Sequence, residues 1–267
     1  MNDSPFMYNP AAFRQENENY AKEGAENGNY VIGLGYNNGI VFLSHNDYVG
    51  EENYKINEVH NNIALVGSGR LSDTVKMKEK AILEADVTEL RYSAQDVHAK
   101  ELANSVLGPF AENQLLMAHP LQAVFLLGDV GTSKNMFYKI IFDGKIIPCE
   151  NFASIGGKLS DDYENWIENN CFEKYKKETT LADAILFGVD CLSKAYEQRY
   201  AERLKSEKIS AFEEILQNGD SIEIAVLDRK IIDTSKFAPI SETRLKHELA
   251  PFKPKELEDL LKRYEIK

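Results

Sequence analysis

The chain has 267 residues, a length that fits one large domain or two small ones and can bury a sizeable core. Its 31 basic and 43 acidic residues give a net charge of −12, which argues against non-specific nucleic-acid binding because such binding needs a basic surface. No apolar run approaches the roughly 18 residues of a membrane span, and the start, MNDSPFMYNP, lacks the basic and apolar regions of a secretory signal. We therefore expect a cytoplasmic protein that binds neither nucleic acid nor a membrane.

A polar helix is predicted close to the N-terminus. Asn9 suits the cap of a helix, and Pro10 suits its first turn. From 11 to 27 the chain is polar except for Phe13, Tyr20 and a few alanines. Phe13 and Tyr20 are seven residues apart and share one face. Because this apolar stripe is narrow, we expect the helix to lie across its own sheet or a neighbouring subunit.

A β-hairpin follows the helix, which is expected to end at Gly28. Residues typical of strands run from 30 to 36 and from 40 to 43, and Asn37-Asn38-Gly39 lies between them. Asn-Gly supplies the φ > 0 residues that a tight hairpin turn needs. The pattern therefore predicts two antiparallel strands joined by a tight turn.

The rest of the chain alternates between blocks of strands and blocks of helices. Leu71, Val75 and Ile82 fall on one side of the first helix of the first block, and Thr180-x-x-Asp183 fits a capping box. The predicted elements are strands 55–59 and 63–69, helices 71–86 and 94–116, strands 123–127, 136–142, 145–147 and 152–155, helices 161–174 and from 180 onward, and a strand over 221–227.

This order predicts an α+β fold and not the βαβ alternation of a parallel sheet. Two antiparallel sheets stacked face to face, each covered by a helix pair, form a four-layer αββα sandwich. We divide the chain into a loose tail (1–8), a single domain (9–235) and a charged, helical C-terminal extension (236–267).

Motifs for a metal or a cofactor are weak. No two of the five histidines share the i, i+4 spacing of a helical metal pair, and the three cysteines lack metal-type spacing and fit reduced thiols. Gly33-x-Gly35 is not followed by a helix, as a phosphate-binding loop would be, and Gly67-Ser68-Gly69 lacks the flanks of a nucleophile elbow. We expect no metal and no cofactor.

The start of the hairpin bears on catalysis. In an N-terminal-nucleophile hydrolase, such a hairpin opens with a Thr, Ser or Cys that cleavage has exposed. Here Gly28-Asn29-Tyr30 occupies that place behind the polar helix, and a carboxamide supplies neither a hydroxyl nor a thiol. The hairpin therefore looks like a hydrolase scaffold without its nucleophile.

Several segments in order resemble a known family, the α-type subunits of the proteasome core particle, particularly the bacterial (actinobacterial) kind. The resemblance covers roughly residues 9–235 and rests on ordered spacing rather than on one strong motif. The matching segments are Asn9-Pro10, 20–24, 28–47, 54–59, 64–69, 137–144, 154–157 and 180–185.

The resemblance implies an N-terminal-nucleophile-hydrolase-like αββα fold and a homo-heptameric outer ring. Neighbouring α subunits, β-type subunits that carry the threonine nucleophile, a ring-shaped AAA ATPase activator and unfolded protein substrates would be the partners. The α subunit itself would be non-catalytic within a threonine-type endopeptidase complex that degrades intracellular proteins.

The resemblance also implies roles for named residues. Lys55 matches the lysine that pairs with the C-terminal carboxylate of an activator tail, and an ammonium suits that task because charge-assisted hydrogen bonds are strong. Gly28 and Gly69 match backbone positions of the same activator-docking pocket. Pro10 matches the turn whose displacement opens the gate, and Tyr8 ends the tail that narrows the pore.

Two alternatives remain open at the level of the sequence. The first is an N-terminal-nucleophile hydrolase, either a β-type subunit or a stand-alone peptidase, which would need processing before a Thr, Ser or Cys near position 29. The second is an isolated adaptor of the same fold that never joins a barrel.

Overall fold

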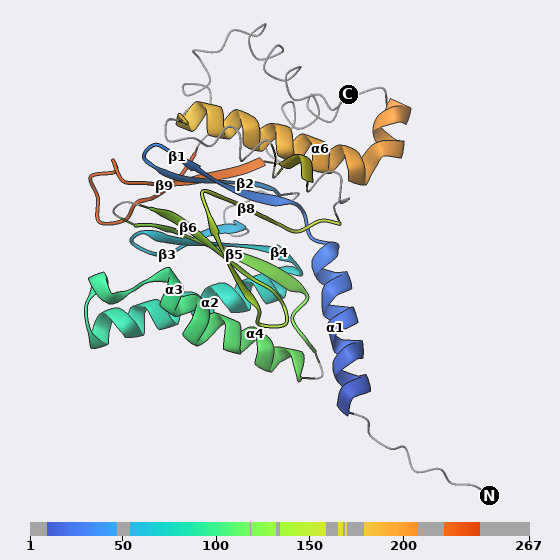
Figure 1. The fold of residues 1–267 in the computed structure, drawn as a ribbon, viewed down its shortest axis with the longest axis horizontal. Helices are drawn as coiled ribbons and strands as arrows, with labels where there is room; N and C mark the ends of the chain where they lie inside the picture. The colour runs from blue at the N-terminus through green and yellow to red at the C-terminus, as the bar shows by residue number, and fades with distance from the viewer. Residues whose placement is uncertain are drawn as a thin grey trace, which may run out of the picture.

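The computed structural model describes most of the chain, and its elements stack in four layers (Figure 1). The described residues are 10–46, 54–117, 119–131, 134–158, 165–167, 169, 179–207 and 222–240, without the side chains of 200 and 202–207. From one side to the other, the layers are helix α6, a first sheet, a second sheet and the helices α2 to α4. The predicted four-layer α+β sandwich is therefore confirmed.

The first sheet contains the hairpin that the sequence predicts. Its five strands lie in the order β10-β9-β2-β1-β8, and every neighbouring pair is antiparallel. Tyr36 pairs with Gly39, so Asn37 and Asn38 form the tight turn. The positive φ expected from Asn-Gly is wrong, because neither Asn38 nor Gly39 has one. The strands are β1 (Val31–Tyr36), β2 (Gly39–His45), β8 (Phe152–Ile155), β9 (Ile222–Asp228) and β10 (Phe237–Pro239).

The second sheet is also antiparallel, in the order β3-β4-β5-β6-β7. Its central strands β4 and β5 are buried along most of their length. Large side chains from the facing surfaces of both sheets, such as Phe42 and Phe137, meet edge to face between them. The strands are β3 (Ile56–His60), β4 (Ile63–Gly69), β5 (Ala123–Val130), β6 (Asn135–Ile140) and β7 (Ile146–Glu150).

A helical layer covers the outer face of the second sheet. The segment predicted as one helix over 94–116 is divided into a 3₁₀ turn, α3, a π-helical turn and α4. In chain order these elements are α2 (Leu71–Arg91), η1 (Ala94–Asp96), α3 (Ala99–Leu102), η2 (Ala103–Leu107) and α4 (Gly108–Leu115).

The apolar side of α2 that the sequence shows is not its buried side. Leu71 and Val75 are exposed, whereas Met77, Ala81 and Ala85 are fully buried against the sheet. Two of these three residues are alanines, which let the helix backbone lie close to the strands, so the apolar residues Leu71 and Val75 do not mark the buried side.

Helix α6 (Leu181–Glu207) covers the first sheet on its outer face. Its predicted capping box forms: the backbone N–H of Asp183 donates to Thr180 Oγ1 at 3.1 Å, and the backbone N–H of Thr180 donates to the Asp183 carboxylate at 3.3 Å. Its inner face includes Ile185, Val189 and Leu192, which are buried in one cluster with the sheet. Of the helix predicted over 161–174, residues 165–167 and 169 are helical, and the others lie outside the described residues.

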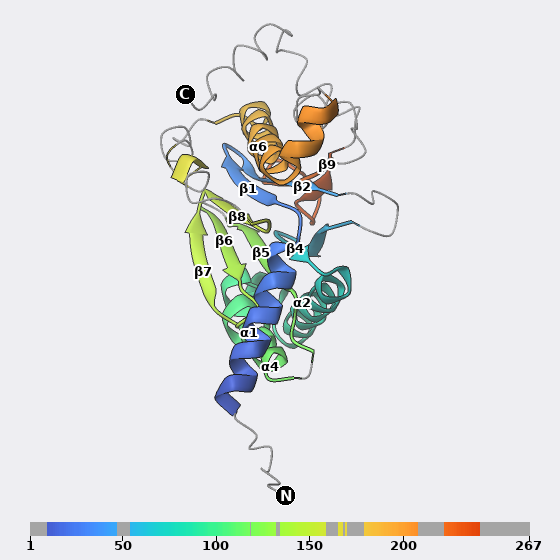
Figure 2. The same ribbon diagram turned by 90° about the vertical axis from the view of Figure 1, so that its right-hand side faces the viewer.

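Helix α1 (Pro10–Glu26) stands at one end of the sandwich, beside the second sheet and α4 (Figure 2). As expected, α1 lies against its own sheet, but its buried face is not the stripe of Phe13 and Tyr20, since Tyr20 is half exposed. Asn17, Ala21 and Ala25 form its buried face instead. The small alanines allow close approach, and the amide of Asn17 provides polar contacts.

One strand of the first sheet lies beyond residue 235, the predicted end of the domain. Strand β10 pairs with β9, so the first sheet continues past residue 235. The tail 1–8 and residues 241–267 lie outside the described residues, and their roles stay predictions.

Candidate functional site

Gly28 and Gly69 lie against each other where α1 ends and β4 ends. A β-carbon on Gly28 would be 2.3 Å from the backbone nitrogen of Gly69 and 2.3 Å from Ser68 Oγ. Gly69 has φ +126°, a conformation that favours glycine, and a β-carbon there would be 2.2 Å from the carbonyl oxygen of Gln122. Both positions therefore require glycine, one for close approach and the other for close approach and backbone conformation.

Lys55 reaches the same region from the start of β3. Its side chain is half-buried, and Nζ donates a hydrogen bond of 2.7 Å to the carbonyl oxygen of His45. The amide of Asn29, the residue after Gly28, donates to the same carbonyl oxygen at 3.3 Å. The carbonyl of His45 thus connects Lys55 to the glycine contact, and the structure brings the three predicted pocket residues into one region.

A buried carboxylate fixes the backbone at Lys55. The backbone N–H groups of Lys55 and Ile56 each donate to Glu223 at 2.8 Å, and the amide of Asn46 donates at 3.0 Å. Burial raises the pKa of Glu223, although these hydrogen bonds and the charge of Lys55 act in the opposite direction. Because Glu223 belongs to β9 of the first sheet, it links that sheet to the first strand of the second.

Asn29 occupies the place where a hydrolase of this fold would carry its nucleophile. Its carbonyl oxygen accepts a hydrogen bond of 2.6 Å from Ser68 Oγ, and its side-chain oxygen accepts one of 3.0 Å from Arg199. The nearby hydroxyl of Ser68 is thus used as a donor, and that residue is 2% exposed. The arrangement fits a structural joint better than a nucleophile with its base.

Arg199 of α6 fastens the exit of α1. Its guanidinium donates to the carbonyl oxygens of Asn27 at 2.9 Å and Gly28 at 3.1 Å. Both carbonyls follow Glu26, the last residue of α1, and that of Gly28 also accepts from the backbone N–H of Gly157 at 3.0 Å. A positive charge at this place suits the negative end of the helix dipole. Beside Arg199 lies a pocket of about 230 Å³, lined among others by Tyr30 and His45.

Residues 25–209 of the chain match the family described as Proteasome subunit. The chain belongs to the proteasome subunit family.

Curated relatives of this proteasome family member carry the name Proteasome subunit alpha. That of Thermobifida fusca (strain YX) is 25% identical over 84% of this chain and 82% of its own length. That of Kineococcus radiotolerans is 25% identical over 85% of this chain and 90% of its own length. That of Mycolicibacterium vanbaalenii is 27% identical over 70% of this chain and 73% of its own length. The resemblance to the actinobacterial α-type subunits, inferred from the ordered motifs, is confirmed.

In this proteasome subunit, Pro10 of the predicted gate lies far from Gly28 of the predicted docking pocket. Pro10 is the exposed first residue of α1, and Tyr8 lies outside the described residues. A helix of 17 residues is about 25 Å long, and α1 therefore separates Pro10 from Gly28 by roughly that distance. A signal from the docking residues to the tail would have to move α1 or pass along it.

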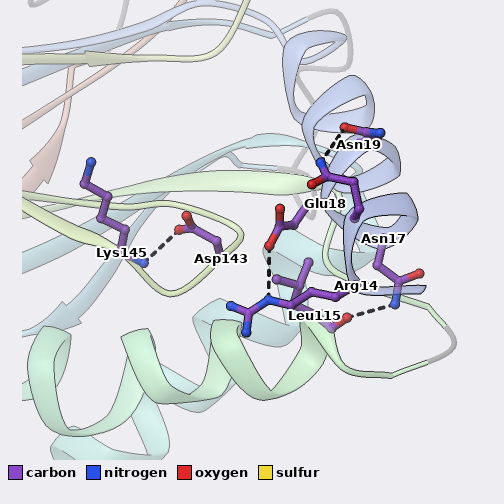
Figure 3. Close-up of polar contacts among 8 residues, drawn as sticks. Arg14, Asn17, Glu18, Asn19, Leu115, Asp143 and Lys145 are labelled. Carbon is purple, nitrogen blue, oxygen red and sulfur yellow. Dashed lines mark hydrogen bonds and ion pairs between the residues drawn. The ribbon is translucent and has the colours of Figure 1, made fainter. Parts of the chain in front are cut away.

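The middle of α1 is held to α4 by Asn17 (Figure 3). Asn17 Nδ2 donates to the carbonyl oxygen of Leu115 at 2.8 Å and to that of Met117 at 3.0 Å. Leu115 is the last residue of α4 and Met117 follows two residues later, where helical partners run out. By contrast, Arg14 bonds to Glu18 within α1 itself, on its exposed side.

Among the described residues, no three His, Cys, Asp or Glu side chains gather closely enough to hold a metal ion. Within the same residues, no helix combines the length and the apolar character needed to cross a bilayer.

Proposed function

We propose that this chain is a non-catalytic, gate-forming α subunit of a proteasome core particle. In this proposal, seven copies form an outer ring on a ring of β-type subunits, which carry the threonine nucleophile and degrade unfolded proteins in the cytoplasm. The observation that carries it is the joint at Asn29. The hydrolase hairpin is preceded by helix α1, and the residue in the nucleophile position is an asparagine bonded to His45 and Arg199.

The family match and the α-type names of the relatives support the ring role. The test is the native mass of this chain co-expressed with the β-type subunit of its own genome. A particle with two homo-heptameric rings of each subunit is the expected result. A monomer, or a small oligomer without the β-type subunit, would contradict the proposal.

Non-catalysis has its own test. An electrophilic inhibitor of proteasomes should leave this chain unmodified in an intact-mass spectrum, while it modifies the β-type subunit in the same particle. A covalent adduct on this chain, with cleavage before a Thr, Ser or Cys, would make it a hydrolase of the same fold.

We further propose that Lys55, Gly28 and Gly69 form a pocket that docks the C-terminal tail of a ring-shaped ATPase. The hydrogen bond to the carbonyl of His45 directs the ammonium of Lys55, and Glu223 holds its backbone. Replacing Lys55 with Ala should abolish stimulation by the activator and leave ring assembly intact. A Lys55→Ala particle that is stimulated normally would place the docking elsewhere.

The gate part of the proposal concerns Pro10, Tyr8 and the tail before them. Tails of residues 1–8 would converge on the axial pore, and docking would shift the start of α1 at Pro10. Deletion of residues 2–8 should raise peptide hydrolysis by the assembled particle in the absence of an activator. Unchanged hydrolysis would contradict the gate.

A further inference from the structure

The C-terminal half of α2 carries an exposed apolar stripe on the side away from the sheet (Figure 1). Leu83 is 56% exposed and Leu90 is 85% exposed, and Val87 between them is partly exposed. Spacings of four and three residues put these side chains on one face of the helix. Tyr92, just past the end of α2, is 74% exposed. Single exposed apolar residues are ordinary, but several of them along one helix face indicate a contact surface.

Charges of opposite sign stand at the two ends of this stripe. Glu79 lies one turn before Leu83, and Arg91 directly follows Leu90; both charged residues are exposed. Among the described residues, neither Glu79 nor Arg91 takes part in an ion pair, whereas Lys80 of the same helix pairs with a glutamate. The stripe therefore has an acidic end near the middle of α2 and a basic end at its C-terminus.

We propose that this stripe is an interaction surface for the same helix of a second copy of the chain, packed antiparallel to the first. With Leu83 opposite Val87 of the second copy, the two-fold axis passes at the level of residue 85. The same symmetry puts Glu79 opposite Arg91 of the second copy, because these two residues are equally far from residue 85. A parallel pair would instead place Glu79 beside Glu79, and like charges disfavour that arrangement.

The surroundings of the stripe suit such a contact. Leu90 falls opposite Lys80 of the second copy, and the methylene groups of a lysine can cover apolar surface. Tyr92 and Arg91 are of the residue types that are enriched in protein interfaces. One helix from each copy makes a small interface, below roughly 1,200 Å² in total, so the association should be weak and dependent on concentration.

This contact differs from those of a seven-membered ring. Neighbours in such a ring meet head to tail through two different surfaces, whereas a self-complementary surface pairs two copies through the same surface. The α2 contact would therefore join two chains, or two rings, and would produce even numbers of copies. It goes beyond the proposed function and does not depend on it.

The first test is the number of copies in the full chain purified without a β-type subunit. Sedimentation velocity and native mass spectrometry over a concentration series should show dimers, or paired rings, whose share grows with concentration. Leu83→Asp puts a charge into the middle of the stripe and should abolish them. Only monomers or single rings at every concentration up to about 1 mM would overturn the proposal. Paired species that Leu83→Asp leaves intact would also overturn it.

The second test exchanges the two charges. Arg91→Glu alone and Glu79→Arg alone each place like charges opposite one another at two symmetric positions, so each should weaken the association by about tenfold. The double variant restores opposite charges with their places exchanged and should associate like the unchanged protein. A double variant as weak as the single ones would overturn the antiparallel pairing.

Glu150→Arg is the matched control for these charge reversals. Glu150 is an exposed carboxylate on β7, at the edge of the second sheet opposite to the strands β3 and β4 that α2 covers. Its reversal changes the net charge of the chain as much as Glu79→Arg does, but it should leave the association unchanged. An equal loss in Glu150→Arg would mean that net charge, and not the α2 contact, governs self-association.

Discussion

The carboxylate of Glu223 accepts a hydrogen bond of 2.8 Å from the backbone N–H of Lys55 and so joins β9 of one sheet to β3 of the other. Glu223 is 7% exposed, and two further donors, on Ile56 and Asn46, converge on the same carboxylate. The position of Lys55 therefore depends on a residue far away in the sequence. A change at Glu223 should affect both stability and any function of Lys55.

Glu223→Gln should lower the free energy of unfolding at pH 7 by about 1–3 kcal/mol. The glutamine offers one acceptor oxygen and turns an NH₂ group toward donors, so at least one buried N–H group loses its partner. Urea unfolding of the purified chain measures this loss. Glu150→Gln on β7 is the matched control, because it removes an exposed carboxylate with the same charge. A loss no larger than that of the control would mean that the carboxylate does not hold β3.

The stability difference between the unchanged protein and Glu223→Gln should change with pH in one direction. Burial raises the pKa of Glu223 above 4.5, so the folded state holds the proton more tightly than the unfolded chain does. The stability that protonated Glu223 adds is fully present below pH 4.5, and it is lost as pH rises through the pKa of Glu223 in the folded state. The difference in unfolding free energy between the unchanged protein and Glu223→Gln should therefore shrink as pH rises. Urea unfolding at a series of pH values tests this, and a difference that grows would contradict it.

Gly28→Ala should destabilise the joint between α1 and β4. The new β-carbon would meet the backbone of Gly69 at 2.3 Å, and backbone cannot rotate away as a side chain can. A loss of about 1–3 kcal/mol is the usual scale for such overpacking. Thermal or urea unfolding measures it. Gly131→Ala is the matched control, since its β-carbon would have its nearest contact at 3.3 Å, and a loss as large at Gly131 would remove the steric explanation.

Short sequence patterns were enough to predict several elements of the fold. The Asn37-Asn38-Gly39 turn and the Thr180 to Asp183 box act over a few residues, so no distant contact was needed to predict them. The inner face of α2 was a different case. Alanines make up much of its sheet-facing side, and Leu71 and Val75 are exposed, so apolar character alone does not identify the buried side.

Local sequence patterns also did not identify the residues of the candidate site. Lys55, Gly28 and Gly69 were named from a family resemblance, since nothing local distinguishes Lys55 from an ordinary strand lysine. Glu223 was missed, although a lone acidic residue inside the apolar strand SIEIAVL was a signal that could have found it. Arg199 lies in a charged helical stretch, and no sequence pattern predicts that it meets a carbonyl 171 residues away.

Thr180→Ala should cost about 1 kcal/mol of stability, the usual value for losing an N-terminal helix cap. The hydroxyl accepts from the backbone N–H of Asp183 at 3.1 Å, and without it that N–H at the start of α6 loses its partner. Thr180→Ser keeps the hydroxyl and is the matched control. Urea unfolding of both variants tests the prediction, which fails if Ser and Ala behave alike.

Asn17→Ala should loosen α1 while the rest of the fold stays intact. The substitution leaves the carbonyls of Leu115 and Met117 without their shared donor, and a lost buried partner costs about 1–3 kcal/mol. Because α1 contacts one end of the sandwich only, the effect should be local. Hydrogen–deuterium exchange should accelerate in peptides of α1 and of the segment after α4, and remain unchanged in β4 and β5.

Gln15→Ala is the control that distinguishes the loss of the Asn17 contacts from a change in helix propensity. Gln15 is an exposed neighbour on α1, and its amide donates to Asn19 of the same helix at 3.3 Å rather than to α4. Exchange over α1 should therefore stay close to that of the unchanged protein. Equal acceleration in both variants would mean that α1 is held by its alanines and by the joint at Gly28, with Asn17 contributing little.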